Sequence, residues 1–222
     1  MKRFLLALAL CAPLFAVADE TAPATKDVFV QGDATVGAAK ASACVACHGP
    51  GGNGAINPEW PKLAGQHSAY IVEQIKAFQS QVRKNPVMMG QAMGLNGRDQ
   101  DMHDIAAFFA SQKAVPGVAS KDSVAVAQQL YRAGDAARGL PACAACHGPT
   151  GAGNGAAAFP RIGGQNSNYT ANQLHAFAAC GNASFKDCTR GGDGKGQMMS
   201  AIAAKLQENE IQALASYVSG LQ

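Results

Sequence analysis

Aromatic residues are scarce in this chain of 222 residues, at 6% of the sequence, and tryptophan occurs only once. Large aromatic side chains supply much of the buried area of most protein cores. A sequence that is rich in alanine and carries 25 glycines therefore has little material for a large core of its own. Charged residues are also few, at 15%, and the formal net charge of +3 includes the charges of Lys2 and Arg3. This composition argues against nucleic-acid binding, which needs a strongly basic surface.

Long hydrophobic runs are absent after the N-terminus, so no later segment is expected to cross a membrane. The one apolar run, residues 4–17, follows two basic residues and ends in the small-residue pattern Ala16-Val17-Ala18. This arrangement is typical of a secretory signal peptide, here residues 1–18, cleaved after Ala18. A retained membrane anchor is the alternative, but the run is short for a transmembrane helix. We therefore expect an exported protein.

Cysteine is more frequent, with seven residues, and four of them lie in two C-x-x-C-H motifs. The motif cysteines are Cys44, Cys47, Cys143 and Cys146, and the histidines that follow them are His48 and His147. This motif attaches c-type haem: two thiols form thioether bonds to one porphyrin, and the histidine binds its iron. A zinc ribbon would need the two cysteine pairs about 15–20 residues apart, and a redox-active dithiol needs no adjacent histidine. The sequence predicts two covalently bound haem c groups.

The chain contains an internal repeat. Adding 99 to a residue number in the first half gives its equivalent in the second, so that the two C-x-x-C-H motifs coincide. In the same register, the sequence PKLAGQ at 61–66 matches PRIGGQ at 160–165 without a gap. Such a match indicates a duplicated unit. We predict a domain at 19–120 and a second domain at 121–222.

The sequence patterns predict helices and no strands. An alanine-rich helix is expected before each haem motif, over Thr35–Ala46 and Asp135–Ala145, and a second helix is expected to begin near Ser68 and near Ser167 or Asn168. Apolar residues recur at i, i+3, i+4 and i+7 in a last helix of each half. They are Met102, Ile105, Ala106 and Phe109, and then Ile211, Leu214, Ala215 and Val218. We predict an all-α fold of two tandem domains.

Methionines are candidates for the second axial ligand of each iron. Apart from the initiator they form two groups, Met88, Met89, Met93 and Met102, and then Met198 and Met199. A thioether ligand suits an electron-transfer haem, and the alternative role of a methionine is core packing. Met88 and Met199 each precede a leucine by seven residues, at Leu95 and Leu206, which favours these two as ligands. The Met-Met doublets leave Met89 as the alternative to Met88.

Residues after each motif can support a haem. Pro61 and Pro160 follow the motif histidines by thirteen residues. A carbonyl in this place can accept the second ring N–H of the histidine and fix its orientation. Lys62 and Arg161 are candidates to pair with haem propionates, and a solvated surface charge is the alternative for both.

Two cysteines, Cys180 and Cys188, belong neither to a haem motif nor to the signal peptide, which contains Cys11. They lie in a segment that lengthens the second half relative to the first. In the oxidising compartment expected for an exported protein, two such cysteines are expected to form a disulfide. Two free thiols are the alternative.

The two haem motifs, the repeated P-[KR]-[LI]-x-G-Q sequence, the distal methionines and the closing helices together resemble the dihaem cytochrome c4 family. The resemblance covers essentially the whole chain after the signal peptide. It implies two all-α cytochrome c domains that face each other about a pseudo-twofold axis, each with one haem ligated by His and Met. His48, His147 and Met199 match the ligands of the family, while the first half leaves Met88 or Met89 open.

The resemblance also implies a function, that of a periplasmic electron carrier. Its donor would be a membrane quinol-oxidising cytochrome bc complex, and its acceptor a terminal haem–copper oxidase, often of the cbb3 type. A carrier needs no catalytic residue and no small-molecule substrate. The alternatives are a cytochrome subunit of a larger complex and a catalytic dihaem enzyme, such as a peroxidase or thiosulfate dehydrogenase, which needs an exchangeable or unusual iron ligand. Cys180 and Cys188, in a segment that departs from the family pattern, are the only candidates for a reactive cysteine.

Overall fold

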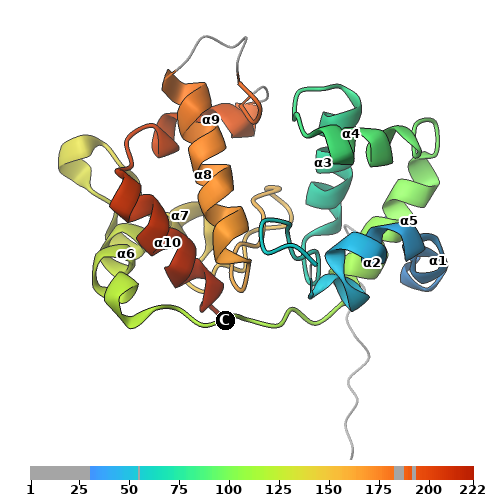
Figure 1. The fold of residues 1–222 in the computed structure, drawn as a ribbon, viewed down its shortest axis with the longest axis horizontal. Coiled ribbons are helices and arrows are strands. Elements are labelled where there is room, and N and C mark those ends of the chain that lie inside the picture. The colour runs from blue at the N-terminus through green and yellow to red at the C-terminus, as the bar shows by residue number, and fades with distance from the viewer. Residues whose placement is uncertain (1–30, 55, 183–187, 192–193) are drawn as a thin grey trace, which may run out of the picture.

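The computed structural model describes residues 31–54, 56–182, 188–191 and 194–222. Within these ranges the secondary structure is helical, with only two isolated β-bridges, which confirms the prediction of an all-α fold. Two helical domains stand side by side and are joined by an extended connection between α5 (Asp99–Ser111) and α6 (Lys121–Ala133) (Figure 1). No helix in the described ranges is long and apolar enough to cross a membrane. The predicted signal peptide, residues 1–18, lies outside the described residues.

Each domain contains a helix with the haem motif, a long middle helix and a long closing helix. In the first domain the helices are α1 (Ala34–Lys40), α2 (Ser42–His48), η1 (Pro50–Gly52), α3 (Ser68–Gln79), α4 (Pro86–Met93) and α5. In the second they are α6, η2 (Ala136–Arg138), α7 (Ala144–His147), α8 (Ser167–Asn182), α9 (Gly194–Ala203) and α10 (Glu208–Ser219). The predicted helix starts at Ser68 and Ser167 and the predicted closing helices are confirmed. The helix predicted over Thr35–Ala46 is present as α1 and α2, which meet at Ala41.

The helix predicted over Asp135–Ala145 is wrong. The helix of this region, α6, ends before it, and the chain then turns sharply. The Asp135 carboxylate accepts hydrogen bonds from the backbone N–H groups of Ala137 and Arg138 at 3.1 and 3.2 Å, and Asp135 also pairs with Leu140 through two backbone hydrogen bonds. Aspartate favours such a turn because its side chain competes for backbone N–H groups.

Two short helices that the sequence analysis did not predict carry the distal methionines. The first, α4, begins after Asn85, whose side-chain oxygen accepts the Met88 N–H at 3.0 Å, and it has Pro86 in its first turn. Both features are typical of a helix start, so the signal was present in the sequence. In contrast, α9 starts with Gly194 and Gly196, and glycine is a poor helix former. The two helices are equivalent, since α4 packs on α3 and α9 packs on α8.

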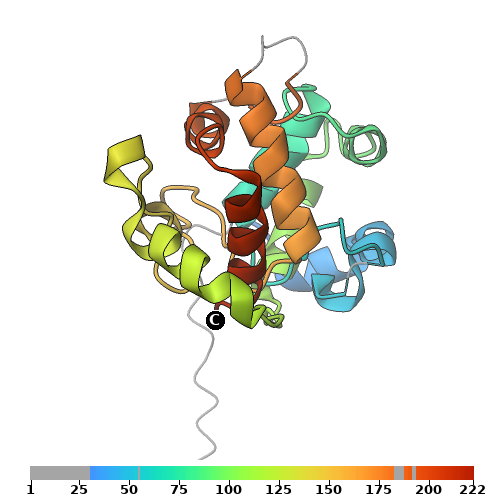
Figure 2. The same ribbon diagram turned by 60° about the vertical axis from the view of Figure 1, so that its left-hand side comes forward.

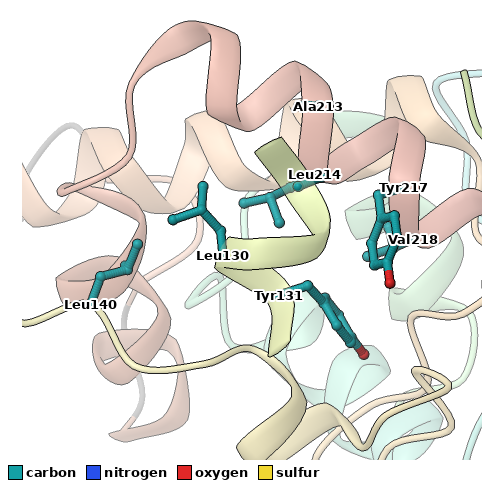
Figure 3. Close-up of a cluster of buried hydrophobic side chains, with 8 residues drawn as sticks. Leu130, Tyr131, Leu140, Ala213, Leu214, Tyr217 and Val218 are labelled. Carbon is teal, nitrogen blue, oxygen red and sulfur yellow. The ribbon is translucent and has the colours of Figure 1, made fainter. Parts of the chain in front are cut away.

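The core of the second domain lies between α6 and α10 (Figure 3). Leu130 and Tyr131 of α6 face Leu214, Tyr217 and Val218 of α10. The Tyr131 ring is 0% exposed, and its centroid lies 5.5 Å from that of Tyr217. Figure 2 shows that α10 also runs beside α8, so the closing helix joins the first and middle helices of its domain.

The first domain is built in the same way around α5. Met102, Ile105 and Phe109 of this helix are buried against α3 and α2. Met102 is 1% exposed and belongs to this core, so it is a packing methionine. Burying one side chain of this size contributes about 1.5–3 kcal/mol.

An ion pair joins each closing helix to an earlier part of its domain. Lys40 of α1 contacts Asp101 at 2.6 Å and Asp104 at 2.5 Å. In the second domain, Arg138 contacts Glu210 of α10 at 2.8 Å. The backbone N–H of residue 33 also donates to Asp104, and this bond, followed by the Lys40 contact, lowers the pKa of Asp104 to about 2.

The two domains contact each other through a reciprocal pair of glutamines. Gln66 accepts the Arg161 N–H at 2.9 Å and donates to the Arg161 carbonyl at 2.8 Å. Gln165 accepts the Lys62 N–H at 2.7 Å and donates to the Lys62 carbonyl at 3.0 Å. Both residues of each contact are repeat equivalents, so the interface has the predicted pseudo-twofold symmetry. This role was not predicted from the sequence, although the glutamine that ends both P-[KR]-[LI]-x-G-Q motifs was its signal.

Candidate haem sites

The two C-x-x-C-H motifs lie on equivalent short helices, α2 and α7. His48 and His147 are the last residues of these helices and are buried, at 6% and 8% exposed. Each is followed by a glycine with positive φ, Gly49 at 79° and Gly148 at 74°. Residues with a Cβ rarely adopt this conformation. The glycines therefore end the helices directly after the histidines.

A proline carbonyl fixes the orientation of each motif histidine. His48 Nδ1 lies 2.8 Å from the Pro61 oxygen, and His147 Nδ1 lies 3.0 Å from the Pro160 oxygen. Because a carbonyl only accepts hydrogen bonds, Nδ1 carries the proton and Nε2 keeps its lone pair for a metal. Burial lowers the pKa of both histidines, which favours the neutral form that binds metals. The predicted role of the two prolines is confirmed.

The motif cysteines do not have the character of a redox-active dithiol. None of the four is in a disulfide. Burial raises the pKa of the Cys44 thiol and raises that of Cys143 to about 11, whereas reactive dithiols have a lowered pKa. The described part of the chain also contains no group of three or more His, Cys, Asp or Glu placed to hold a metal ion. The raised thiol pKa argues against the dithiol alternative.

The residues around each motif fit a haem c group. Each site offers two thiols on one turn of chain and one buried imidazole with a free Nε2, which is the donor set that haem attachment uses. Arg161 has a buried Nε atom without a hydrogen-bond partner among the described residues. Because an unpaired buried donor is costly, a haem propionate would be a suitable acceptor. Lys62, the repeat equivalent, instead donates to the Val115 carbonyl at 2.8 Å.

The register of α4 and α9 favours Met88 over Met89 as the equivalent of Met199. Met88 and Met199 are half-buried, and each precedes a fully buried alanine, Ala92 or Ala203, by four positions. Just after each helix, the leucine three positions beyond that alanine donates its backbone N–H to the alanine carbonyl at 3.0 Å. Pairing Met89 with Met199 would shift every one of these matches by one residue.

Cys180 and Cys188 form a disulfide, as predicted. Cys180 lies on α8, and Cys188 is buried close to it. In this bond neither cysteine is a free thiol, so the alternative of two free thiols is wrong. The bond also holds the described residues 188–191 beside α8.

Two helix-borne motifs, each with a buried histidine held by a proline carbonyl, define a c-type cytochrome with two haem domains. The cytochrome c family model matches residues 34–113 and 124–222, so the chain belongs to the cytochrome c family and carries two covalently bound haem c groups. Within this family it belongs to the cytochrome c4 proteins. It is 44% identical over 190 residues to cytochrome c4 of Pseudomonas aeruginosa, with 86% of this chain and 89% of that protein covered.

A solved structure places the chain in the same group, and a further relative is less similar. The crystal structure of reduced recombinant cytochrome c4 from Pseudomonas stutzeri is 40% identical and superposes with a TM-score of 0.75, over 86% of this chain and 100% of that chain. A thiosulfate dehydrogenase electron acceptor from Stutzerimonas stutzeri is 33% identical over 197 residues, with 87% of this chain and 84% of that protein covered. The predicted family, fold and haem content are confirmed, and the protein is a dihaem electron-transfer cytochrome.

Proposed function

We propose that the protein is a periplasmic carrier that takes electrons from a membrane cytochrome bc complex and passes them to a terminal haem–copper oxidase of the cbb3 type. The observation that carries this proposal is the equivalence of the two sites. Each site has a buried neutral histidine held by a proline carbonyl, and each has a methionine helix in the same register. Matched sites with fixed ligands suit electron transfer, which requires little rearrangement. This function needs no catalytic residue, small-molecule substrate or nucleic acid.

The role of each residue follows from its place. Bound haem supplies an iron that accepts and releases one electron. We assign His48 and His147 as the proximal ligands and Met88 and Met199 as the distal ligands. The thioether positions are Cys44, Cys47, Cys143 and Cys146. The proline carbonyls keep the imidazole rings from rotating, and a methionine sulfur raises the reduction potential relative to a second histidine.

The proposed periplasmic location rests on two features. The first is the signal-peptide pattern of residues 1–18. The second is the Cys180–Cys188 disulfide, because disulfides persist in oxidising compartments such as the bacterial periplasm. A periplasmic carrier can reach both a bc complex and an oxidase from the same side of the membrane.

The test uses reduced holoprotein and bacterial membranes that contain both enzymes. We expect cyanide-sensitive oxidation of the c-type absorption bands, and re-reduction on addition of a quinol that a bc-complex inhibitor prevents. Reduction by a thiosulfate dehydrogenase but not by the bc complex would replace the proposed donor. If the purified protein itself turns over peroxide or thiosulfate at enzymatic rates, the assignment as a carrier fails.

A further inference from the structure

The domain interface contains a pair of arginines outside both haem motifs. Arg83 of the first domain lies over the ring of Phe78, with its Cζ 4.5 Å from the ring centroid. Arg190 of the second domain lies over Phe177 at 4.8 Å. The two phenylalanines are repeat equivalents, and each cation–π contact restrains the guanidinium that it supports. The interface therefore presents two equivalent, oriented guanidinium groups.

Each of these arginines hydrogen-bonds to both domains. Within its own domain, Arg83 donates to the Gln74 side-chain oxygen at 2.9 Å, and Arg190 donates to the Gln173 side-chain oxygen at 2.8 Å. The acceptors in the opposite domain are Tyr169 and Gln173 for Arg83, at 2.9 and 3.0 Å, and Tyr70 and Gln74 for Arg190, at 2.8 and 2.7 Å. Charged donors in partly buried settings make the stronger kind of hydrogen bond. These contacts lie between α3 and α8, the middle helices on facing sides of the interface (Figure 1).

The two arginines reach this arrangement from different places in the sequence. Arg83 follows the phenylalanine beneath it by five residues, whereas Arg190 follows its own phenylalanine by thirteen. The Cys180–Cys188 disulfide compensates for the extra residues, because it brings the two Cα atoms to 4.6 Å. The Arg190 N–H also donates to Cys180 Sγ at 3.4 Å. The disulfide therefore places Arg190 where a much shorter connection places Arg83.

We propose that the two arginines and their four acceptors form an interdomain clasp, set on one side by the disulfide, that fixes the orientation of the two domains. The backbone supports the clasp, since the Lys84 N–H donates to the Thr189 carbonyl across the interface at 2.9 Å. Arg83 and Arg190 are positioning residues, because they act through the domain interface. A fixed domain orientation also fixes the separation of the two haems. The use of that separation in electron transfer rests on the proposed function, whereas the clasp itself does not.

Hydrogen exchange of the ferrous holoprotein tests the clasp without any electron-transfer assay. The reporters are the backbone N–H groups of Lys62 and Arg161, which are bonded to glutamines of the opposite domain. Their acceptors, Gln165 and Gln66, are not clasp residues, so both N–H groups exchange faster together only if the whole interface opens more often. A purely local change beside the disulfide would alter the Lys84 N–H alone.

The variants are Arg83→Gln, Arg190→Gln and the double variant Cys180→Ser/Cys188→Ser. Losing hydrogen bonds from a charged donor should raise the population of the open interface, and with it the exchange rates of both reporters, by about tenfold or more. Arg190→Lys should resemble Arg190→Gln, because an ammonium group lacks the planar set of donors. The matched control is Arg132→Gln, which removes the same charge from an exposed position on α6 and should leave both rates unchanged.

Visible spectra of every variant establish that the haem sites are intact. Wild-type exchange of Lys62 and Arg161 in both arginine variants would overturn the clasp. Fast exchange in Arg190→Gln with wild-type rates in the serine variant would overturn the role of the disulfide. If the membrane assay fails while exchange rises as expected, the proposed function falls and the clasp stands.

Discussion

Replacing Tyr131 by phenylalanine removes one hydrogen bond that links the core of the second domain to its haem motif. The Tyr131 hydroxyl donates at 2.6 Å to the carbonyl of Gly148, the residue directly after His147. The ring itself is buried, and phenylalanine keeps its contact with Tyr217. Burial raises the pKa of Tyr131, so the phenol remains a donor over the accessible pH range. The substitution thus isolates a single polar contact.

The expected cost follows from the burial of both partners. The hydroxyl disappears with the mutation, and the carbonyl of half-buried Gly148 keeps only the longer hydrogen bond from the Gly151 N–H, at 3.2 Å. A loss of this kind costs about 1–2 kcal/mol, towards the lower end of the range because water can reach the carbonyl. For a domain of about 100 residues this lowers the Tm by about 5–10 °C. Calorimetry of the holoprotein should show this shift in the transition of the second domain only.

Tyr217→Phe is the matched control. Tyr217 lies opposite Tyr131 in the same core, and its hydroxyl makes no hydrogen bond within the described residues. Its loss should change the free energy of unfolding by less than about 0.5 kcal/mol. Equal stability of wild type and Tyr131→Phe, or equal losses in the two variants, would refute the reasoning.

Three further predictions concern the haems and the acid stability. Mass spectrometry of the denatured mature chain should show two haem additions, and a single addition would contradict the assignment. Met199→Ala and Met88→Ala should each abolish the methionine-to-iron charge-transfer band of one haem and lower its potential; if Met89→Ala does so instead of Met88→Ala, the register is shifted by one. The pKa of Asp104, lowered to about 2, implies stabilisation that is complete above about pH 4 and lost as the pH falls through about 2. Asp104→Asn should flatten that part of the denaturant-measured stability profile, and an unchanged profile would contradict this origin.

The chemistry of the haem sites was predictable because it depends on short stretches of sequence. The C-x-x-C-H motif fits on one turn of chain, and Pro61 and Pro160 follow at a fixed distance in both halves. The closing helices were predictable because one face of each is buried, which leaves an apolar repeat. The internal repeat added a second, independent copy of every one of these signals.

The missed features depend on contacts between distant residues. Arg190 bonds to Tyr70, 120 positions earlier in the chain, and no local pattern indicates such a partner. The turn at Asp135 was missed because alanines on either side favour a helix, while the side chain of Asp135 competes for the backbone N–H groups. The start of α9 was missed because its glycines are not helix formers, so that packing on α8 decides its conformation.

The reciprocal contacts of Gln66 with Arg161 and of Gln165 with Lys62 have the form of an interface in a symmetric homodimer, in which each subunit offers the same surface. In this chain the two halves are encoded separately. A substitution at Gln66 removes one of the two contacts, whereas the same substitution in a homodimer would remove both. Joining the halves also makes their association independent of protein concentration. Each half can therefore change alone, and the disulfide beside Arg190, with no counterpart at Arg83, is a change that only one half carries.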